Sequence, residues 1–199
     1  LSMLNSKKRR LGNQINPGGK ITTENVLEID NLTVEFEKDG RKITALDKIS
    51  LKISENQIVG LIGESGSGKS TLANTILSIL PDNGDITSGN IIFDKKPINS
   101  LSDFQLNQLR ASDMSLIPQA AMNSLNPVLK IKDQLLDSLV FQEKDSVLKN
   151  KKIVHLLNQV GLEGNVADKY PHQLSGGMKQ RVTMAMAISH KPKLLIADE

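Results

Sequence analysis

The sequence predicts an α/β fold with a mixed sheet, made of a parallel core, an antiparallel β subdomain and an inserted α-helical subdomain. Three observations indicate this. Continuous apolar runs are typical of strands buried on both faces of a parallel sheet, and they occur at Ile58–Ile62, Met114–Ile117 and Leu194–Ala197. Apolar residues alternate in the first quarter of the chain, which predicts antiparallel strands. From Val128 to Val160 strands are absent and the apolar spacing is helical, with one apolar face at Val128, Ile131, Leu135 and Leu139 and another at Val147, Val154, Leu157 and Val160.

The antiparallel strands can be placed from the parity of their apolar residues. Leu27 and Ile29 share one parity, whereas Leu32 to Phe36 follow the other, so we expect a bulge or turn at Asp30–Asn31. Glu37–Gly40 then turns the chain into a second strand. This second strand is expected at Lys42–Leu46, and the further strands expected are one through Ile49, Leu51 and Ile53 and another at Gly89–Asp94. Ser102 and Gln105 form a capping box that predicts the start of a short helix.

A glycine-rich segment links the strand that ends at Ile62 to a helical run from Thr71 to Leu80. It reads Gly63-Glu64-Ser65-Gly66-Ser67-Gly68-Lys69-Ser70 and fits the pattern G-x-x-x-x-G-K-[ST]. Its glycines permit backbone angles that turn consecutive N–H groups toward phosphates, and the helix N-terminus adds positive potential. The setting predicts a P-loop NTPase core. A plain glycine turn is the alternative, and the flanking strand and helix argue against it.

The roles within this segment follow from the chemistry of its side chains. Lys69 would reach the β- and γ-phosphates of a nucleotide, and Ser70 would hold Mg²⁺. We expect cofactor-binding contacts from the whole segment and the residue after it: Gly63, Glu64, Ser65, Gly66, Ser67, Gly68, Lys69, Ser70 and Thr71.

The last apolar run of the chain finishes in two acids, Asp198 and Glu199. Adjacent carboxylates at the end of a strand beside a phosphate loop suit phosphate hydrolysis. Asp198 would bind Mg²⁺ through its water shell, and Glu199 would orient and polarise the attacking water. Taken without the loop, the pair would be equally consistent with a solvated chain end.

The segment Leu174–Gln180 reads LSGG-x-x-Q, and with it the chain resembles the nucleotide-binding subunit of ABC transporters. Ser175, Gly176 and Gly177 can begin a helix whose unpaired N–H groups and dipole favour an anion. The resemblance implies that this anion is the γ-phosphate of ATP held by a second ATP-binding subunit, in a homo- or heterodimer. It implies ATP hydrolysis that requires Mg²⁺.

Two more site residues come from the resemblance. Gln119 follows the strand Met114–Ile117, where the family places a glutamine that touches Mg²⁺ and the attacking water. It joins Lys69 and Glu199 as a catalytic candidate, and Ser70 and Asp198 as a metal candidate. Phe36 lies where the family stacks an aromatic ring on adenine, although a phenylalanine there could equally fill the core.

Two stretches resemble the ATPases of dipeptide, oligopeptide and nickel importers, namely Ala121–Val128 and Tyr170–Gln173. This likeness implies contact with two transmembrane permease subunits and an indirect link to an external solute-binding protein. It places the protein peripherally on the cytoplasmic face of the membrane. The resemblance covers residues 26–199, with the helical subdomain at about 121–175, and leaves residues 1–25 as a flexible polar and basic leader.

Composition agrees with this assignment. The 199 residues are 38% hydrophobic, which suits one substantial core, and cysteine is absent. The 25 basic and 22 acidic residues are too balanced to require nucleic acid, so we expect no nucleic-acid partner. No apolar run approaches the ~18 residues that cross a bilayer. The histidines lack metal-site spacing and the methionines near the signature suit a core; these are His155, His172 and His190, and Met178, Met184 and Met186.

Family members continue beyond the catalytic glutamate, with a loop and a histidine that complete the site. We therefore expect residues 1–199 on their own to hydrolyse ATP poorly. A nucleotide-binding module without turnover is the alternative. A DNA- or ribosome-associated relative is a third possibility, but the about 55 residues that separate Gln119 from the signature are too few for long coiled-coil arms.

Overall fold

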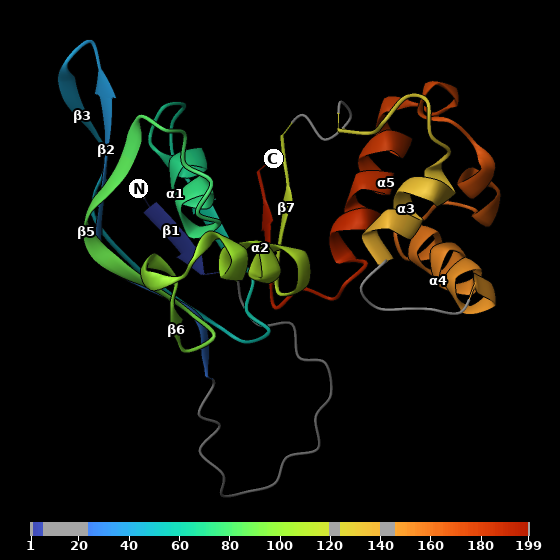
Figure 1. Ribbon diagram of the computed structural model, residues 1–199, viewed down its shortest axis with the longest axis horizontal. Coiled ribbons are helices and arrows are strands. Elements are labelled where there is room, and N and C mark those ends of the chain that lie inside the picture. The colour runs from blue at the N-terminus through green and yellow to red at the C-terminus, as the bar shows by residue number, and fades with distance from the viewer. Residues whose placement is uncertain (1, 6–23, 120–123, 140–145, 199) are drawn as a thin grey trace, which may run out of the picture. The chain divides into compact units, whose positions relative to one another are not determined.

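The computed structural model describes residues 2–5, 24–119, 124–139 and 146–198. The chain divides into two compact units, residues 1–106 and 107–199. The first unit holds most of the strands, and the second holds a two-stranded sheet and a cluster of helices (Figure 1). Among the described residues, none of the helices is long and apolar enough to span a bilayer.

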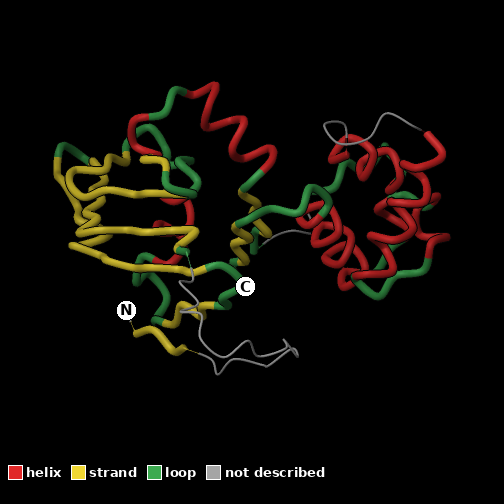
Figure 2. Tube along the Cα trace, turned by 90° about the horizontal axis from the view of Figure 1, so that it is seen from below, coloured by secondary structure: helices red, strands yellow, loops and turns green. Residues whose placement is uncertain are grey.

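The first unit is built on a four-stranded antiparallel sheet in the order β3-β2-β5-β6. Its strands are β2 (Asn25–Lys38), β3 (Arg41–Ser54), β5 (Gly84–Phe93) and β6 (Lys96–Pro97). They lie side by side as yellow tubes in Figure 2. The apolar side chains on the inner face of β2 are almost completely buried: Leu27, Ile29, Leu32 and Val34. The predicted antiparallel subdomain is therefore confirmed.

The change of parity in β2 has the predicted cause. The pairing of β2 with β3 shifts register between Ile29 and Leu32, and Asn31 between them has a φ of 47°. The hairpin turn at Asp39 and Gly40, with φ of 52° and 70°, also lies where it is expected. The two strands predicted after this turn form one strand, β3, because a positive φ of 49° at Lys48 absorbs the extra residue between them.

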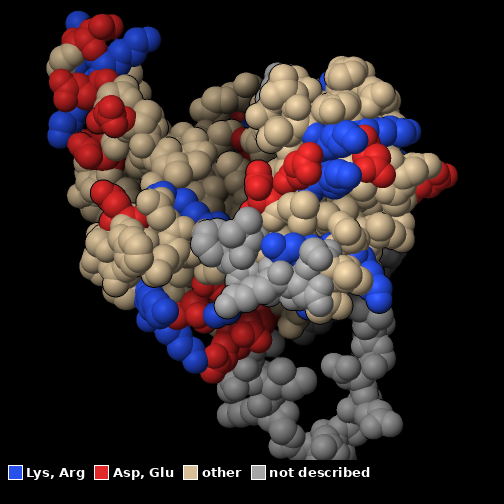
Figure 3. All heavy atoms as spheres, turned by 45° about the vertical axis from the view of Figure 1, so that its right-hand side comes forward, with Lys and Arg blue, Asp and Glu red and all other residues tan. Residues whose placement is uncertain are grey.

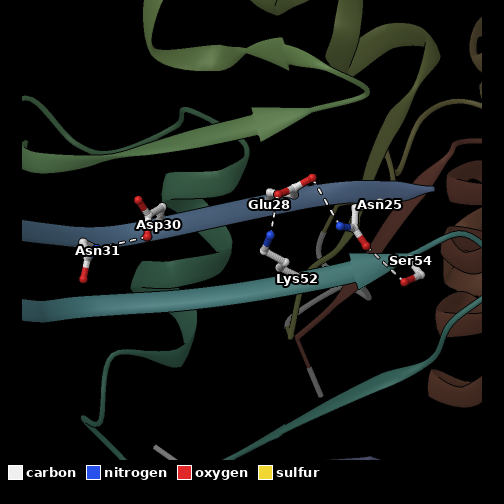
Figure 4. A network of polar contacts seen from close by, with 6 residues as sticks. All are labelled: Asn25, Glu28, Asp30, Asn31, Lys52 and Ser54. Atoms are coloured by element: carbon white, nitrogen blue, oxygen red, sulfur yellow. Dashed lines mark hydrogen bonds and ion pairs between the residues drawn. The ribbon is translucent and has the colours of Figure 1, made fainter. Parts of the chain in front are cut away.

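A polar network joins the start of β2 to the end of β3, where the chain leaves β3 for β4 (Figure 4). Lys52 Nζ lies 2.9 Å from Glu28 Oε2, and Asn25 Nδ2 donates to Glu28 Oε1 at 3.2 Å. The Ser54 hydroxyl donates to Asn25 Oδ1, and the Ser54 amide donates to Gln57 Oε1. The hydrogen bond that Lys52 donates to Glu28 lowers the pKa of the Glu28 carboxyl group. The network fixes the exit of β3.

The prediction for the next strand was wrong in its direction and burial. We expected Ile58–Ile62 to be a parallel strand buried on both faces. In the structure, β4 (Val59–Ile62) pairs antiparallel with β1 (Ser2–Asn5), a strand within the expected leader. Ile58 and Ile62 are 83% and 50% exposed. A continuous apolar run predicts a strand, but it does not specify the direction of the strand's neighbour, and here a leader segment supplies that neighbour.

The second unit contains the parallel pair that the sequence predicts. Strand β7 (Met114–Ile117) lies parallel to β8 (Leu194–Ala197), with Ile117 opposite Ala197. Helix α2 (Asp103–Ser112) leads into β7. Its predicted capping box is confirmed, since the Gln105 amide donates to Ser102 Oγ and the Ser102 amide donates to Gln105 Oε1.

The helical cluster contains α3 (Ile131–Leu139), α4 (Ser146–Gln159) and α5 (Gly176–Ile188). Short 3-10 turns follow α4 at η3 (Gly164–Asp168) and η4 (Pro171–Gln173), and another, η1 (Ile98–Ser100), lies in the first unit. One core joins the three helices, and its most completely buried members are Ile131, Leu135, Leu139, Leu157, Val182 and Ala185. Met178 and Met186 pack against this core, and Met184 packs against Ile117 and Ala187, as predicted.

Two predicted helix faces need correction. Val128 was assigned to the buried face of α3, but it lies before that helix and is 75% exposed. Val147 and Val154 were assigned to the buried face of α4, yet both are exposed. Leu157 is completely buried, as predicted, and helix α4 buries Ile153 and Leu156 beside it. Because α4 has apolar residues on more than one side, spacing alone did not identify the face that packs.

Candidate nucleotide-binding site

The glycine-rich segment forms a turn between β4 and helix α1 (Lys69–Ile76). Gly66 and Gly68 have φ of 79° and 89°, in the left-handed region that favours glycine. A Cβ on Gly68 would lie 2.8 Å from both Ala45 O and Leu46 Cδ2 of β3. The turn is thus held against the antiparallel sheet. A Cβ on Gly66 would meet nothing within 4 Å, so this glycine borders open space.

Lys69 folds back over the turn. Its ammonium Nζ donates to Gly63 O at 2.8 Å and to Glu64 O at 2.7 Å, and it lies 3.4 Å from Ser67 Oγ. Neutral carbonyl oxygens thus hold the positive charge at the start of α1. A phosphate oxygen carries a full negative charge, so it would make a stronger, charge-assisted hydrogen bond with the same ammonium.

The N-terminus of α1 suits an anion. Gly68 caps it without a side-chain hydrogen bond, and its first turn contains no acidic residue. Ser70 is exposed in that first turn and Thr71 is half-buried. The first N–H groups of a helix are unpaired within the helix and carry partial positive charge. The geometry therefore supports the predicted phosphate cradle at Gly63–Thr71.

Phe36 lies half-buried in β2 of the same unit. Its ring packs against Gly84, where an added Cβ would approach the ring Cε1 to 2.5 Å. It lines a small cavity of about 60 Å³ together with Lys42, Asn83, Thr87 and the acids Glu35, Glu37, Asp82 and Asp85. Gly84 thus supports one side of the ring. The cavity is too small to accommodate a purine base, so stacking of adenine on Phe36 stays a prediction.

The signature segment begins helix α5 in the second unit. Ser175 is the N-cap, with its Oγ accepting a hydrogen bond from the Met178 amide at 3.3 Å. Ser175, Gly176 and Gly177 are exposed, and the first turn contains no acid. A Cβ on Gly177 would meet nothing within 4 Å. The predicted helix opening is present, and its surface is accessible to an anion.

Gln119 and Asp198 follow the ends of β7 and β8. The Asp198 amide donates to Ile117 O at 3.0 Å, which continues the parallel pairing to the last described residue. The carboxyl ends of β7 and β8 therefore lie at the same edge of this small sheet, as they do in any pair of parallel strands. Glu199, the predicted catalytic carboxylate, lies outside the described residues.

The candidate metal residues offer oxygen donors. The described residues contain no cluster of three His, Cys, Asp or Glu side chains. The Ser70 hydroxyl, the Gln119 side-chain amide and the Asp198 carboxylate each carry a hard oxygen donor of the kind that Mg²⁺ binds, and their role as ligands stays a prediction. Ser70 belongs to the first unit, and Gln119 and Asp198 belong to the second. The donor set fits Mg²⁺ in its chemistry.

Surface charge shows no preference for one sign on the face in Figure 3, where Lys and Arg are interspersed with Asp and Glu. Such mixing gives no extended basic field on that face.

Sequence reasoning also missed Gln134, a glutamine of α3 that is 5% exposed. Its place between Ile131 and Leu135 on the buried face was the available signal.

Comparison with known proteins gives the same assignment. The family model described as "ABC transporter" matches residues 46–199. The dipeptide transport ATP-binding protein DppD of Escherichia coli is 37% identical over 87% of this chain and 54% of its own length. The oligopeptide transport ATP-binding protein AppD of Bacillus subtilis is 39% identical over 87% of this chain and 54% of its own length. The chain spans about half the length of the curated relatives it matches.

Solved structures agree with the sequence comparison. The dimeric structure of MJ0796, a bacterial ABC transporter cassette, has a TM-score of 0.77 and 30% identity over 87% of this chain and 73% of its own. Its dimeric post-hydrolysis state bound to ADP and Pi has the same scores. The mixed α/β fold, the glycine-rich turn and the signature helix are thus accounted for together: the chain belongs to the ABC transporter family, as an ATP-binding cassette related to peptide importer ATPases.

Proposed function

We propose that the full-length protein is the ATP-binding and ATP-hydrolysing subunit of an ABC importer, and that it powers uptake of peptides or nickel through ATP-driven dimer closure. The observation that carries the proposal is the phosphate cradle. Lys69 lies between two loop carbonyls at a helix N-terminus that has neither an acidic residue nor a side-chain cap. This arrangement favours a bound polyphosphate over any neutral ligand.

In the proposed reaction, Lys69 exchanges the carbonyls of Gly63 and Glu64 for the β- and γ-phosphate oxygens. The backbone N–H groups from Gly66 to Thr71 surround the same phosphates, while Phe36 stacks on adenine. Bound Mg²⁺ neutralises phosphate charge. Ser70, Gln119 and Asp198 are the residues that would hold it. Glu199 accepts a hydrogen bond from the attacking water and polarises it.

A second subunit completes the site in this proposal. Ser175, Gly176 and Gly177 of one subunit cover the γ-phosphate that the other subunit holds. The exposed, acid-free start of α5 supports this role, and a dimeric cassette among the structural relatives is consistent with it. ATP would then bridge two subunits, and hydrolysis would remove the bridge.

The transported cargo is proposed from relatives. Several are named as dipeptide or oligopeptide transport ATP-binding proteins. We infer that this subunit sits peripherally on the cytoplasmic face of the membrane. There it would bind two permease subunits and act indirectly with an external solute-binding protein.

The test uses the full-length protein. Glu199→Gln should retain ATP binding and slow hydrolysis, because an amide is a much weaker base than a carboxylate. With this variant, light scattering should show a dimer that forms with ATP and Mg²⁺ and not with ADP. Lys69→Ala should abolish this dimer. The unmodified protein, reconstituted with its permeases, should release phosphate and take up labelled peptide. ATP-dependent pairing without phosphate release in that system would favour the nucleotide-binding module without turnover.

A further inference from the structure

Helix α4, orange in Figure 1, exposes apolar side chains on the face that it turns away from the core. Its buried side chains are Ile153, Leu156 and Leu157. Val147 and Val154 are seven residues apart, so they share one face of the helix, and they are 60% and 41% exposed. Leu148 is 47% exposed beside Val147. A single exposed apolar residue is ordinary, but three within about two turns form a patch that needs an explanation.

The same helix is basic. Its 14 residues contain no acid and three charged side chains, Lys149, Lys151 and Lys152. Lys151 is exposed and lies one turn after Val147, on the same face. In the described part of the chain Lys149 and Lys151 form no ion pair, whereas Lys132 of α3 pairs with Asp168. Over residues 143–159 four lysines outnumber two acids, so the segment keeps a positive net charge.

Exposed apolar side chains beside lysines fit the surface of an anionic lipid bilayer. A helix of this kind lies in the plane of the interface, with its apolar side chains among the headgroups. The apolar stems of its lysines rest on the same surface while their ammonium groups reach the lipid phosphates. No described helix is long and apolar enough to span a bilayer, so the contact of α4 would be peripheral.

Other partners fit this face of α4 less well. If two copies of the chain paired symmetrically through α4, lysines would lie opposite lysines and repel. Nucleic acid would bind the lysines but would leave the apolar side chains unused, and α4 contains no Arg, Phe, Tyr or Trp to stack on bases. An acidic protein segment could also bind lysines, and vesicles made of lipid alone separate that case from a lipid contact.

We propose that α4 is a lipid-contact helix. Lys149, Lys151 and Lys152 bind the headgroups of anionic phospholipids, and Val147 and Val154 enter the interface. The inference rests on the proposed function for its setting, because the proposed subunit works at a membrane. It requires neither ATP nor permeases, so a protein that fails to hydrolyse ATP can still show the lipid contact.

Sedimentation with vesicles tests the contact in the full-length protein without permeases or nucleotide. The protein should bind vesicles of phosphatidylglycerol and phosphatidylcholine, more weakly as salt is added, and should not bind phosphatidylcholine alone. The α4 variant combines Lys149→Gln, Lys151→Gln and Lys152→Gln. It should lower the partition coefficient about a hundredfold, since each lysine near an anionic surface contributes about fivefold. Equal partition coefficients of the α4 variant and the wild type would overturn the proposal.

Two controls separate α4 from the other basic residues. Glutamine at three exposed lysines of the first unit removes the same charge and should lower the partition coefficient less than about threefold; these are Lys38, Lys48 and Lys96. The segment Lys7–Arg10 is a second source of vesicle affinity, so the comparison is repeated with its four residues changed to glutamine. The α4 variant should still lower the partition coefficient by a similar factor. Loss of that difference would assign the binding to the leader and overturn the proposal.

A tryptophan reporter shows whether α4 itself enters the interface. Residues 1–199 contain no tryptophan, so Val147→Trp adds a distinct signal. Its emission should shift to shorter wavelength on vesicles that contain phosphatidylglycerol, and brominated lipid should quench it. Ile43→Trp, at an isoleucine of β3 that is 51% exposed, is the matched control and should show neither change. Absence of quenching at position 147, or equal quenching at the two positions, would overturn the proposal.

Discussion

The Ser175 side chain accepts a hydrogen bond from the Met178 amide, so the signature serine is also the cap of its own helix. The same hydroxyl is predicted to face the γ-phosphate of a partner subunit. A hydroxyl can do both, because it accepts from the backbone while its proton is directed elsewhere. The structural role of Ser175 and its proposed functional role therefore overlap, and variants are needed that separate them.

Three substitutions of Ser175 separate these roles. Ser175→Ala should lower helix stability by about 1 kcal/mol through the lost cap and also weaken ATP-dependent dimerisation. Ser175→Asn keeps a neutral cap and should retain stability. Ser175→Asp keeps the cap but places a negative charge against the γ-phosphate, so stability should hold while dimerisation disappears. Thermal unfolding and light scattering measure the two properties. Dimerisation of the Asp variant equal to wild type would contradict a phosphate contact.

Lys69→Ala tests the phosphate cradle. The ammonium group makes its contacts with backbone carbonyls at the exposed turn, so its loss should leave the melting temperature nearly unchanged. Affinity for ATP should fall at least about tenfold, as expected for a lost charge-assisted contact. Lys96→Ala, at an exposed lysine of β6, is the control. Calorimetric titration with ATP makes the comparison, and equal affinity in the two variants would remove Lys69 from the site.

Two glycines of the turn should respond differently to alanine. Both have positive φ, which costs an alanine about 1–2 kcal/mol. Gly68→Ala also places its Cβ 2.8 Å from Ala45 O, so it must displace the turn from the sheet, whereas Gly66→Ala enters open space. We expect the larger fall in melting temperature for Gly68→Ala. Equal falls would show that the contact with β3 relaxes without cost.

Phe36 can be tested for stacking separately from packing. Phe36→Leu retains an apolar side chain against Gly84 but removes the ring, and should weaken ATP binding by about 1–3 kcal/mol. Binding of inorganic triphosphate, which lacks adenine, should be unchanged. Phe36→Tyr retains the ring and should bind ATP normally. If Phe36→Leu weakened ATP and triphosphate equally, the ring would be part of the core and not of the base site.

The sequence predicted best those features that depend on local chemistry. The capping box of Ser102 and Gln105 and the bulge at Asn31 are set by neighbouring residues, and both are present. In the segment Gly63–Ser70, likewise, the glycines give the backbone its conformational freedom and Lys69 supplies the positive charge that the predicted phosphate cradle needs. Family membership followed from the motif Leu174–Gln180, and the comparisons confirm it.

Features that depend on distant partners were harder to predict. The apolar run of β4 did not reveal that Ser2–Asn5 would pair with it in an antiparallel sense. Val128 continued the helical spacing of α3, but Pro127 and the turn at Asn126 keep it outside the helix. The burial of Gln134 was not predicted, because its hydrogen-bond partners lie in a loop five to eight residues earlier in the chain. Strand pairing, side-chain burial and hydrogen bonds to a distant loop depend on tertiary structure, so the identity of a single residue does not determine them.

The ion pair between Lys132 and Asp168 gives a pH prediction for the helical unit. Nζ and Oδ1 lie 2.9 Å apart and join α3 to the end of η3, next to the hydrogen bond from the Ile131 amide to Lys169 O. The hydrogen bond to Lys132 lowers the pKa of Asp168 from its ordinary 3.8, and the same bond raises the pKa of Lys132 from 10.5. Both side chains are partly exposed, so the effect on stability should be small.

The sign of the effect differs at the two ends of the pH range. Because its pKa is lowered, Asp168 contributes its stability above pH 3.8 and loses it as pH falls through the lowered value. Lys132 contributes below pH 10.5 and loses its contribution as pH rises through its raised value. Asp168→Asn should therefore speed amide exchange at Ile131 at neutral pH, with the difference from wild type vanishing in strong acid. Asp137→Asn, at an exposed acid of α3, should not. A difference that persists below the pKa of Asp168 would show that the variant acts by something other than the ion pair.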